Sequence, residues 1–422
     1  MKPSKTSLQA ACALAVALLV GSAAHAQPAP AASAPPMTVR PEVGKPLQEV
    51  QALFKDKKYA EALVKIKEAE AVPNLTPYEK MVTDRMHGVA ASGVGDDATA
   101  VKSFDAAIAS GLLKPDEEVQ LVDAVARSAF RAKDYKRSAD AANREIELGG
   151  KDAQMPEIRI KAYYLANDYA AVVRYARPDF DAAEAAGRPT EESMLRVLAS
   201  SYNKLGDDAG YAHALELLLA HYPTADYWLD RLARLANQSG FAEALMLDVY
   251  RLKTATGTMT DTDDFVQAAQ MSLAGGLPIE ARSFIEAGYA SGKLGTGAGA
   301  PNQKKLRDSI TRAAAEDEKA IATGSVAGRK AQSQFDTGHE MVMAGKFDAG
   351  IAAMEQAIAQ GGLKQPQWAR LHLGEAYYAA GNKAKAIETF KAVGGTDGAA
   401  DLARLWAIHA AYVKPAAAPA KG

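Results

Sequence analysis

The sequence predicts an all-α protein: a superhelical α-solenoid of stacked helix pairs with a capping helix at its C-terminal end. Three observations predict this fold. Residues 47–413 are rich in alanine and other helix formers, with apolar residues three and four positions apart. No segment shows the alternation typical of a strand. A short turn motif recurs about every 33 to 39 residues, which indicates a repeat array rather than one large core.

Composition excludes several classes of protein. The 422 residues are 48% hydrophobic and 24% charged, which is typical of a globular chain. Lys plus Arg number 49 against 51 Asp plus Glu, so no excess of positive charge favours nucleic acid. Cys12 is the single cysteine, which excludes a disulfide framework and a cysteine-ligated metal site.

Residues 1–26 have the pattern of a secretory signal peptide. Two lysines precede an apolar run over 8–20, and a small-residue cleavage site ends at Ala26. The run is too short to span a bilayer, and no later stretch is long enough either. Cys12 lies inside this run, in a context that does not favour lipidation. We expect a mature chain that begins after Ala26, has no integral membrane segment, and is periplasmic or secreted.

Composition and spacing divide the chain into segments. After the signal peptide 1–26, we expect a Pro/Ala linker over 27–43, N-terminal repeats over 44–294, a Gly-rich loop and irregular long helix over 295–330, C-terminal repeats over 331–398, a capping helix over 399–413 and a disordered tail over 414–422. In 295–330 the repeat spacing is lost. This segment fits either a decayed helix pair or a single bracing helix.

The clearest repeat lies near the C-terminus. It combines Leu373-Gly374, the turn Gly381-Asn382-Lys383, and then Ala386 and Phe390. This unit resembles the tetratricopeptide repeat, and with its signal peptide the chain resembles exported bacterial members of that family. In the family pattern the small residue lets two helices approach closely, and the alanine and large apolar residue of the second helix fill the space between them.

The same turn recurs through the chain, so the resemblance covers about nine helix pairs. The other turns are Lys57-Lys58-Tyr59, Gly95-Asp96-Asp97, Lys133-Asp134-Tyr135, Asn167-Asp168-Tyr169, Gly206-Asp207-Asp208, Ser239-Gly240-Phe241, Gly275-Gly276-Leu277 and Gly345-Lys346-Phe347. The match is good in the first and last units and weaker between them.

The resemblance also implies where a partner would bind. In this family the first helix of each pair lines a concave groove that accepts a peptide or a helix. Carrying the repeat register over places these residues in the groove: Arg127, Phe130, Arg131, Lys161, Tyr164, Arg196, Asn203 and Lys204. This predicted groove is basic with two aromatic residues, which suits a carboxylate or an acidic peptide. The same pattern also fits cationic side chains that only solvate a helix surface.

Nearer the C-terminus the predicted groove is apolar. Its residues are Phe335, His339, Met343, Trp368 and Tyr378. Such a surface suits an amphipathic helix of a partner, and it could equally be covered by the long helix near 302–322.

Patterns for catalysis, cofactors and metals are missing. The seven histidines are scattered singly, and there is no HExxH motif or EF-hand loop, so we expect no metal site and no cofactor. Asp261, Asp263 and Asp264 fit a helix start better than a calcium loop. The alternating glycines over 295–299 lack the strand and lysine of a phosphate-binding loop. No serine or lysine lies in a nucleophile motif.

Together these patterns predict a non-enzymatic periplasmic adaptor that binds a peptide or helix of a cell-envelope protein assembly in its groove. The alternative is an accessory protein that binds or hydrolyses glycan or peptidoglycan. Hydrolysis would need two carboxyl groups facing one cleft. Asp123 and Glu157, on neighbouring first helices, are the one candidate pair.

Overall fold

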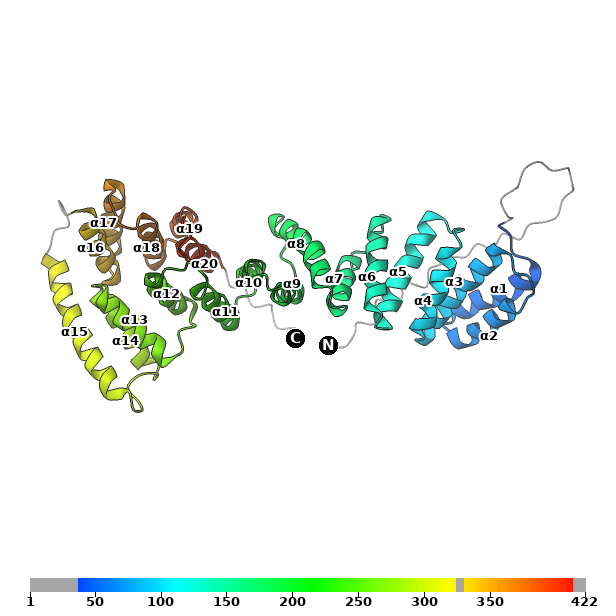
Figure 1. The fold of residues 1–422 in the computed structure, drawn as a ribbon, viewed down its shortest axis with the longest axis horizontal. Helices are drawn as coiled ribbons and strands as arrows, with labels where there is room; N and C mark the ends of the chain where they lie inside the picture. Colours follow the sequence, from blue (N-terminus) through cyan, green and yellow to red (C-terminus); the bar gives the residue numbers. More distant parts are fainter. Residues whose placement is uncertain (1–36, 324–329, 413–422) are drawn as a thin grey trace, which may run out of the picture. The chain divides into compact units, whose positions relative to one another are not determined.

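The computed structural model describes residues 37–323 and 330–412, and within these ranges the chain is helical and has no strand. The described ranges contain twenty α-helices and one short 3-10 helix, η2 (Glu243–Leu245). The predicted all-α solenoid of helix pairs is therefore confirmed (Figure 1). The predicted signal peptide, most of the Pro/Ala linker and the predicted tail lie outside the described residues.

The chain forms two compact units. Unit 1 comprises the residues up to 190 together with 200–206, and unit 2 comprises 191–199 and the residues from 207 onward. The boundary thus falls within helix α9 (Glu192–Leu205) rather than at the Gly-rich loop near 295.

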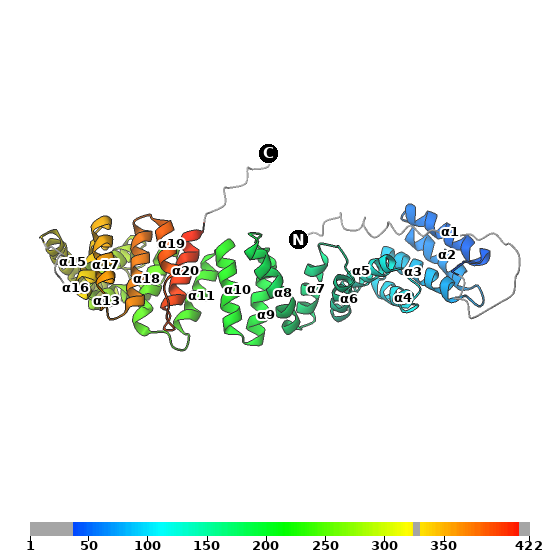
Figure 2. The same cartoon turned by 90° about the horizontal axis from the view of Figure 1, so that it is seen from above.

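Unit 1 is a series of antiparallel helix pairs, each joined by a short turn. Its helices are α1 (Pro41–Lys55), α2 (Tyr59–Glu70), α3 (Pro77–Val94), α4 (Asp97–Ala109), α5 (Pro115–Arg131), α6 (Tyr135–Glu147), α7 (Met155–Leu165) and α8 (Tyr169–Ala185). Each helix contacts the next one in the chain. Figure 2 shows the successive pairs along this unit. Small and branched apolar residues, among them Leu47, Ile66, Val82 and Leu121, form a buried core that runs from one pair to the next.

Helix α3 begins with a reciprocal cap. The Thr76 hydroxyl accepts the backbone N–H of Glu79 at 3.2 Å, and the Glu79 carboxylate accepts the backbone N–H of Thr76 at 2.9 Å. Arg40 donates to the same carboxylate through Nε at 2.9 Å and Nη2 at 2.8 Å. Because Arg40 immediately precedes α1, this carboxylate joins the starts of two helices.

The predicted turns have a common backbone conformation. In all nine, one residue has a positive φ, which reverses the chain after the first helix of the pair. Six of these residues are glycines, whereas Lys57, Lys133 and Asn167 adopt the conformation with φ of 58°, 63° and 62°. The small residues of the repeat also have the predicted role, since a Cβ on Gly374 would lie 2.4 Å from the Phe390 ring.

Unit 2 starts as a further series of helices and then turns back on itself. Its first arm consists of α10 (Asp208–His221), α11 (Ala225–Ala236), the 3-10 helix η2 (Glu243–Leu245), α12 (Met246–Thr256), α13 (Thr262–Ala274) and α14 (Pro278–Ala290). Its second arm consists of α16 (Ala331–Met343), α17 (Phe347–Gln360), α18 (Pro366–Ala379), α19 (Lys383–Lys391) and α20 (Ala399–Ala411). In Figure 1 the second arm lies along the first.

A single long helix, α15 (Ala300–Thr323), leads from the first arm to the second. It packs on α14 and buries Ile310 and Ala314. Of the two alternatives left open by the sequence, the described part of this segment, residues 295–323 and 330, contains one helix and no helix pair. Earlier in the chain, Asp261, Asp263 and Asp264 lie at the start of a helix, as the sequence predicts: α13 begins at Thr262, directly after Asp261.

Contacts between distant residues hold the two arms of unit 2 together. Leu232 and Val249 of the first arm share one buried core with Leu371 and Trp406 of the second. At the surface of this core, Arg404 Nε donates to Glu216 Oε2 at 2.7 Å across 188 residues of sequence.

The last helix corrects a prediction. We expected 399–413 to cap an open end, but α20 packs against α10, α12, α18 and α19. Its residues Leu402, Ala403 and Leu405 are completely buried. These residues lie on more than one face of the helix, so neighbouring helices cover α20 on several sides. The helix therefore closes the interior of unit 2. Within the described ranges, no helix is both long and apolar enough to cross a membrane.

Candidate functional site

The predicted groove residues of unit 1 lie on the first helices of its pairs. Arg127, Phe130 and Arg131 are on α5, and Lys161 and Tyr164 are on α7. We call these five residues the first-helix face of unit 1. They are exposed or partly exposed. The remaining three predicted residues, Arg196, Asn203 and Lys204, are exposed on α9. Arg196 belongs to unit 2 and the other two to unit 1.

The predicted basic character of this face needs a correction, because its cations are paired with acids. Arg127 Nε donates to Asp123 Oδ1 at 3.0 Å, and its Nη2 pairs with Asp152. Arg131 Nε donates to both carboxylate oxygens of Asp97 at 3.0 Å. These ion pairs neutralise the positive charges of Arg127 and Arg131, which the sequence analysis treated as unpaired.

Lys161 is likewise paired with Glu157, one helical turn away. The situation on α9 is different: neither Arg196 nor Lys204 forms an ion pair with any residue in the described part of the chain. These two side chains keep the positive charge expected of the predicted groove.

The two aromatic residues of the first-helix face also contribute to the turns. The Phe130 ring lies 5.6 Å from the Tyr135 ring, edge to face, and Tyr164 makes the same contact with Tyr169 at 5.6 Å. Each pair joins the end of a first helix to the start of its second helix. The Tyr164 hydroxyl also lies 2.9 Å from Ser200 Oγ. These rings therefore present only part of their surface to a partner.

The two carboxylates considered for glycan hydrolysis are each engaged on their own helix, Asp123 with Arg127 and Glu157 with Lys161. Burial raises the pKa of Asp123, and the Arg127 charge opposes that rise. The structure thus offers two separate ion pairs here, where hydrolysis needs an acid and a base that face one another.

The predicted apolar groove is a buried part of unit 2. Phe335 and His339 are only 4% and 3% exposed. Met343, Trp368 and Tyr378 are partly buried against the same core. The Trp368 indole N–H donates to Asp397 at 2.7 Å, and the Tyr378 hydroxyl lies 2.9 Å from His409 Nε2. Phe335 and His339 are therefore not accessible to a partner, whereas Met343, Trp368 and Tyr378 keep part of their surface exposed. Of the two alternatives, the open groove is corrected at Phe335 and His339, which the chain itself covers.

The cover on this surface comes from two sources. The long helix near 302–322, which is α15 in the structure, covers part of it as considered, because Met343 packs against a buried cluster that contains Ala314 and Ile321. Phe335 instead shares its core with residues of α11 and α12, such as Leu235 and Leu252. Two arms of one unit fill the surface that a single row of repeats would leave open.

A buried cluster of charged and polar side chains lies where the two arms meet. It consists of Asp248, Arg251, Glu280, His339, His372 and Glu375, and we call it the Arg251 cluster. Five of the six are 8% exposed or less, and the side chain of His372 is 19% exposed. The residues come from α12, α14, α16 and α18.

Arg251 makes most of the contacts in the cluster. Its Nε and Nη2 donate to the two carboxylate oxygens of Glu280 at 2.6 and 2.8 Å, and its Nη1 donates to Asp248 Oδ1 at 2.6 Å. Its Nη2 lies 3.5 Å from His339 Nε2. Burial lowers the pKa of His339 well below its usual value, and the nearby Arg251 charge adds to this effect. The imidazole of His339 is therefore neutral.

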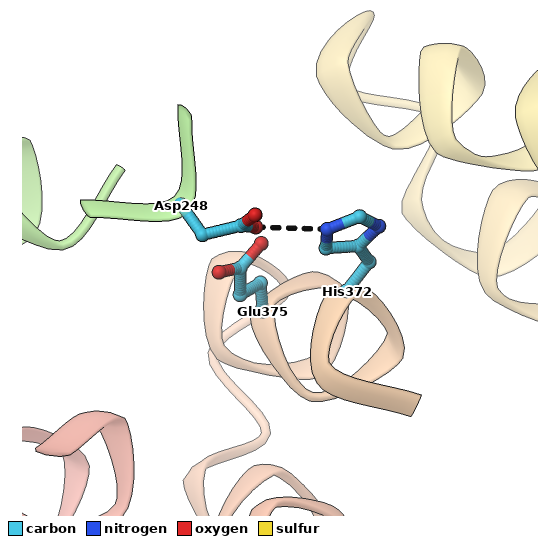
Figure 3. Close-up of side chains that lie close together, drawn as sticks. All are labelled: Asp248, His372 and Glu375. Carbon is cyan, nitrogen blue, oxygen red and sulfur yellow. Dashed lines mark hydrogen bonds and ion pairs between the residues drawn. The ribbon is translucent and has the colours of Figure 1, made fainter. Parts of the chain in front are cut away.

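His372 reaches the cluster from the second arm. Its Nε2 lies 2.8 Å from Asp248 Oδ1 (Figure 3). Burial alone would raise the pKa of Asp248, but His372 and Arg251 lower it to about 2. Glu375 shares α18 with His372, and burial raises its pKa well above the usual value. Its Oε2 is 3.7 Å from Arg251 Nη1.

Sequence reasoning missed this cluster because its members lie far apart in the chain. Histidines that are single in the sequence come together in space, and the His339 and His372 rings are 5.5 Å apart. Local signals do exist. His372 and Glu375 are three residues apart on α18, a spacing that places two side chains on the same side of a helix. Asp248 and Arg251 have the same spacing on α12. Among the residues that could hold a metal ion, Asp248, His372 and Glu375 have ligand atoms within 4.8 Å of one another.

Comparisons with known proteins support the repeat fold. Residues 341–412 match the family model described as "Tetratricopeptide repeat". No curated protein sequence matches the chain. A chain from the structure of Naa15/Naa10 bound to HypK-THB is 15% identical with a TM-score of 0.36; the match covers 83% of this chain and 57% of that one.

The TPR domain of P58(IPK) is 12% identical with a TM-score of 0.23, and the match covers 87% of this chain and 97% of that domain. At these scores neither likeness transfers a site or a partner to this chain. The sequence match to the family model runs from the end of α16 through α20. The chain is therefore an all-helical protein similar to tetratricopeptide repeat proteins, with the family model matched over residues 341–412.

Proposed function

We propose that this protein is a non-enzymatic scaffold of the cell envelope that binds a peptide or helix of a partner protein through the first-helix face of unit 1 and the exposed cationic side chains of α9. Tetratricopeptide repeats support a role in protein–protein interaction. The observation that carries the proposal is the difference between the units. The predicted groove residues are accessible in unit 1, whereas in unit 2 the two arms bury Phe335 and His339.

The chemistry of the exposed surface favours a partner with acidic side chains. Arg196 and Lys204 on α9 form no ion pair with a described residue, so they can pair with carboxylates of a partner without breaking an existing contact. Arg127 and Arg131, in contrast, would have to exchange their present acids for new ones. We therefore expect α9 to contribute most of the electrostatic specificity.

A role outside the cytoplasm is part of the proposal. It rests on the signal-peptide pattern of residues 1–26, which lie outside the described residues. The test is mass spectrometry of the amino terminus of the protein from a cell fraction outside the cytoplasm. A mature chain that begins directly after Ala26 supports export, and a full-length chain confined to the cytoplasm contradicts it.

A non-enzymatic role is supported by the state of the carboxylates. Asp123 and Glu157 are held in ion pairs on the first-helix face. The acidic groups of the Arg251 cluster, Asp248, Glu280 and Glu375, are 2%, 2% and 6% exposed. A polymeric substrate such as peptidoglycan has no access to side chains buried to that degree.

The experiment is affinity capture of the mature protein from chemically crosslinked cell envelopes, followed by mass spectrometry. The test variant is Arg196→Glu with Lys204→Glu on α9. The matched control is Lys102→Glu with Lys136→Glu, which makes the same charge change at exposed positions of the second helices α4 and α6. Surface substitutions of this kind alter stability by about 0.5 kcal/mol or less, so all three proteins should have the same helical circular dichroism signal.

The proposal expects a protein partner that is captured by the wild type and the control but lost with the α9 variant. Equal capture by all three proteins would contradict a role for α9. Recovery of glycan without protein would instead support the alternative function, an accessory protein of peptidoglycan.

A further inference from the structure

The Arg251 cluster contains three side chains arranged as ligands around one point. Figure 3 shows the Glu375 carboxylate beside the contact between Asp248 and His372. Asp248 Oδ1 and His372 Nε2 are 2.8 Å apart, and the ligand atoms of all three residues lie within 4.8 Å of one another. Two atoms bound to one tetrahedral metal ion at about 2.0 to 2.2 Å lie about 3.3 to 3.6 Å apart, so Asp248 and His372 would have to separate only slightly to admit the ion.

Glu375 is the observation that points to a missing ligand. The residue is 6% exposed, and neither of its carboxylate oxygens makes a hydrogen bond of normal geometry within the described ranges; its charged neighbour is Arg251 Nη1, 3.7 Å from Oε2, and the Trp406 indole is close by. Burying a carboxylate without a well-formed hydrogen bond is costly, and native structures seldom contain one without a reason. The carboxylate is directed toward Asp248 and His372 (Figure 3), where a bound cation would satisfy it.

The charges of the cluster leave room for a cation despite the presence of Arg251. The guanidinium group makes a two-bond ion pair with Glu280 at 2.6 and 2.8 Å, so those two charges balance. Burial favours the protonated form of Glu375 in the metal-free protein, and a bound cation would displace that proton, so Asp248 and Glu375 would carry two further negative charges in the metal-bound state. A divalent cation is the ligand whose charge matches this pair.

The donor atoms narrow the class of ion. One imidazole nitrogen and two carboxylate oxygens suit a first-row transition ion, whereas calcium and magnesium prefer oxygen ligands alone. Three protein ligands also leave a further position for water, as in many zinc sites. We propose that Asp248, His372 and Glu375 bind a divalent first-row transition ion, of which Zn²⁺ is the one to test, and that this ion joins α12 to α18.

The position of the site defines its role. Asp248 belongs to the first arm of unit 2 and the other two ligands to the second, so the ion links segments 124 residues apart in the sequence. Arg251 Nη1 donates to Asp248 at 2.6 Å and so orients that ligand from outside the site. The site is structural: it holds the second arm against the first, and it does not depend on the proposed partner-binding surface.

The test is isothermal titration of Zn²⁺ into the purified mature protein after removal of metal with a chelator, with thermal unfolding measured in parallel. We expect one ion per chain and an increase in the unfolding temperature when Zn²⁺ is present. Co²⁺ in place of Zn²⁺ should produce visible absorption bands typical of nitrogen and oxygen coordination.

Glu375→Gln is the main variant because it keeps the size of the side chain and removes its charge. His372→Gln is the second variant. Each should weaken Zn²⁺ binding by at least about ten-fold and reduce the rise in unfolding temperature. The matched control is His87→Gln in unit 1, since His87 also lies 2.8 Å from a carboxylate, that of Glu70, but at a more exposed position. This control should bind Zn²⁺ as the wild type does.

Two results would overturn the proposal. One is the absence of stoichiometric Zn²⁺ binding and of any thermal shift in a natively folded wild-type protein. The other is binding that remains unchanged in Glu375→Gln and His372→Gln with native circular dichroism, because the ion would then bind elsewhere. If one variant does not fold, the other variant and the Co²⁺ spectrum of the wild type still decide the question.

Discussion

Asp248 of α12 and His372 of α18 are 124 residues apart in the sequence, yet their side chains meet at 2.8 Å in the interior of unit 2. A single row of repeats brings each helix into contact mainly with its neighbours in sequence. The contact between Asp248 and His372 therefore shows that the second arm of unit 2 returns along the first. This return buries Phe335 and His339 of the predicted apolar groove, and the binding role that we propose therefore falls to the exposed first-helix face of unit 1.

Close helix packing at Gly338 leads to the first prediction. A Cβ at this position would lie 2.8 Å from the Gly350 carbonyl oxygen and 3.0 Å from the Ala353 Cβ, and both atoms belong to the facing helix α17. Backbone atoms cannot move aside as a flexible side chain can. We expect Gly338→Ala to lower the free energy of unfolding by about 1 to 3 kcal/mol, measured by urea unfolding followed by circular dichroism.

Gly44→Ala in α1 is the control for that substitution. The nearest atom to its Cβ, Val39 Cγ1, would be 3.7 Å away, which is an ordinary contact. Alanine is favoured over glycine inside a helix, so this variant should be slightly more stable, by about 0.5 to 1 kcal/mol. An equal loss of stability in both variants would show that Gly338 has no special packing role.

The turn between α5 and α6 gives the second prediction. Lys133 has a φ of 63°. This backbone conformation is energetically unfavourable for a residue with a Cβ, and it carries no such cost for glycine. We expect Lys133→Gly to raise the free energy of unfolding by up to about 1 kcal/mol. Lys136→Gly, at an exposed position inside α6, should lower it by about 1 kcal/mol. Changes of the same sign in urea unfolding of the two variants would contradict this account.

The carboxylate of Glu79 gives a prediction for acid conditions. The Arg40 guanidinium, together with the backbone N–H groups of Thr76 and Arg40, lowers the pKa of Glu79 from 4.5 to about 2. A lowered pKa in the folded state stabilises the protein above pH 4.5, and this stabilisation is lost as the pH falls toward 2.

Glu79→Gln should therefore cost stability at pH 7, by about 1 kcal/mol because the partner Arg40 is 42% exposed and solvent weakens the pair. The difference from the wild type should shrink as the pH falls from 4.5 to 2. Thermal unfolding across this range measures it, with Glu61→Gln at a 62% exposed position as the control. A difference that does not change with pH would show that the ionised carboxylate is not responsible.

Glu340 of α16 gives the opposite dependence on pH. The residue is 5% exposed, and its carboxylate oxygens have no hydrogen-bond partner with normal geometry among the described residues. Burial raises its pKa from 4.5 to about 8, and the charges of Asp317 on α15 and Glu280 on α14 act in the same direction. The Ile279 backbone and Arg251 oppose the rise.

A raised pKa makes the folded state hold a proton that the unfolded chain releases. Stability should therefore fall as the pH rises from 4.5 to 8, and the loss should be complete above pH 8. Glu340→Gln should be more stable than the wild type at pH 9, by a few kcal/mol, and equal to it near pH 4. Chemical unfolding at both pH values measures the difference, and Glu316→Gln, exposed on α15, serves as the control. An unchanged profile in Glu340→Gln would contradict the assignment.

The parts of the fold that sequence could predict are those determined by neighbouring residues. Each of the nine turns contains a residue with positive φ, and small residues such as Gly374 lie where two helices approach. Turn chemistry and helix spacing are local, so they leave a pattern in the sequence.

The fold of unit 2 and its buried cluster could not be predicted in the same way. The apolar residues Phe335 and Trp368 have the same spacing whether a partner or another helix of the chain covers them. The ion pairs of Arg127 and Arg131 likewise depend on acids 25 and 34 residues away. The local signs of the cluster were the spacing of His372 and Glu375 on α18 and that of Asp248 and Arg251 on α12.

The central claim is that unit 1 binds the partner and that unit 2 is closed by its own second arm. In-cell photocrosslinking tests this claim most directly. A photoreactive residue would replace Gln120 on α5 or Lys161 on α7, and in a separate variant Asp336 on α16; all three positions are at least partly exposed. The account predicts a crosslinked partner from Gln120 and Lys161 and none from Asp336. A partner crosslinked from Asp336, with none from the two positions in unit 1, would contradict it.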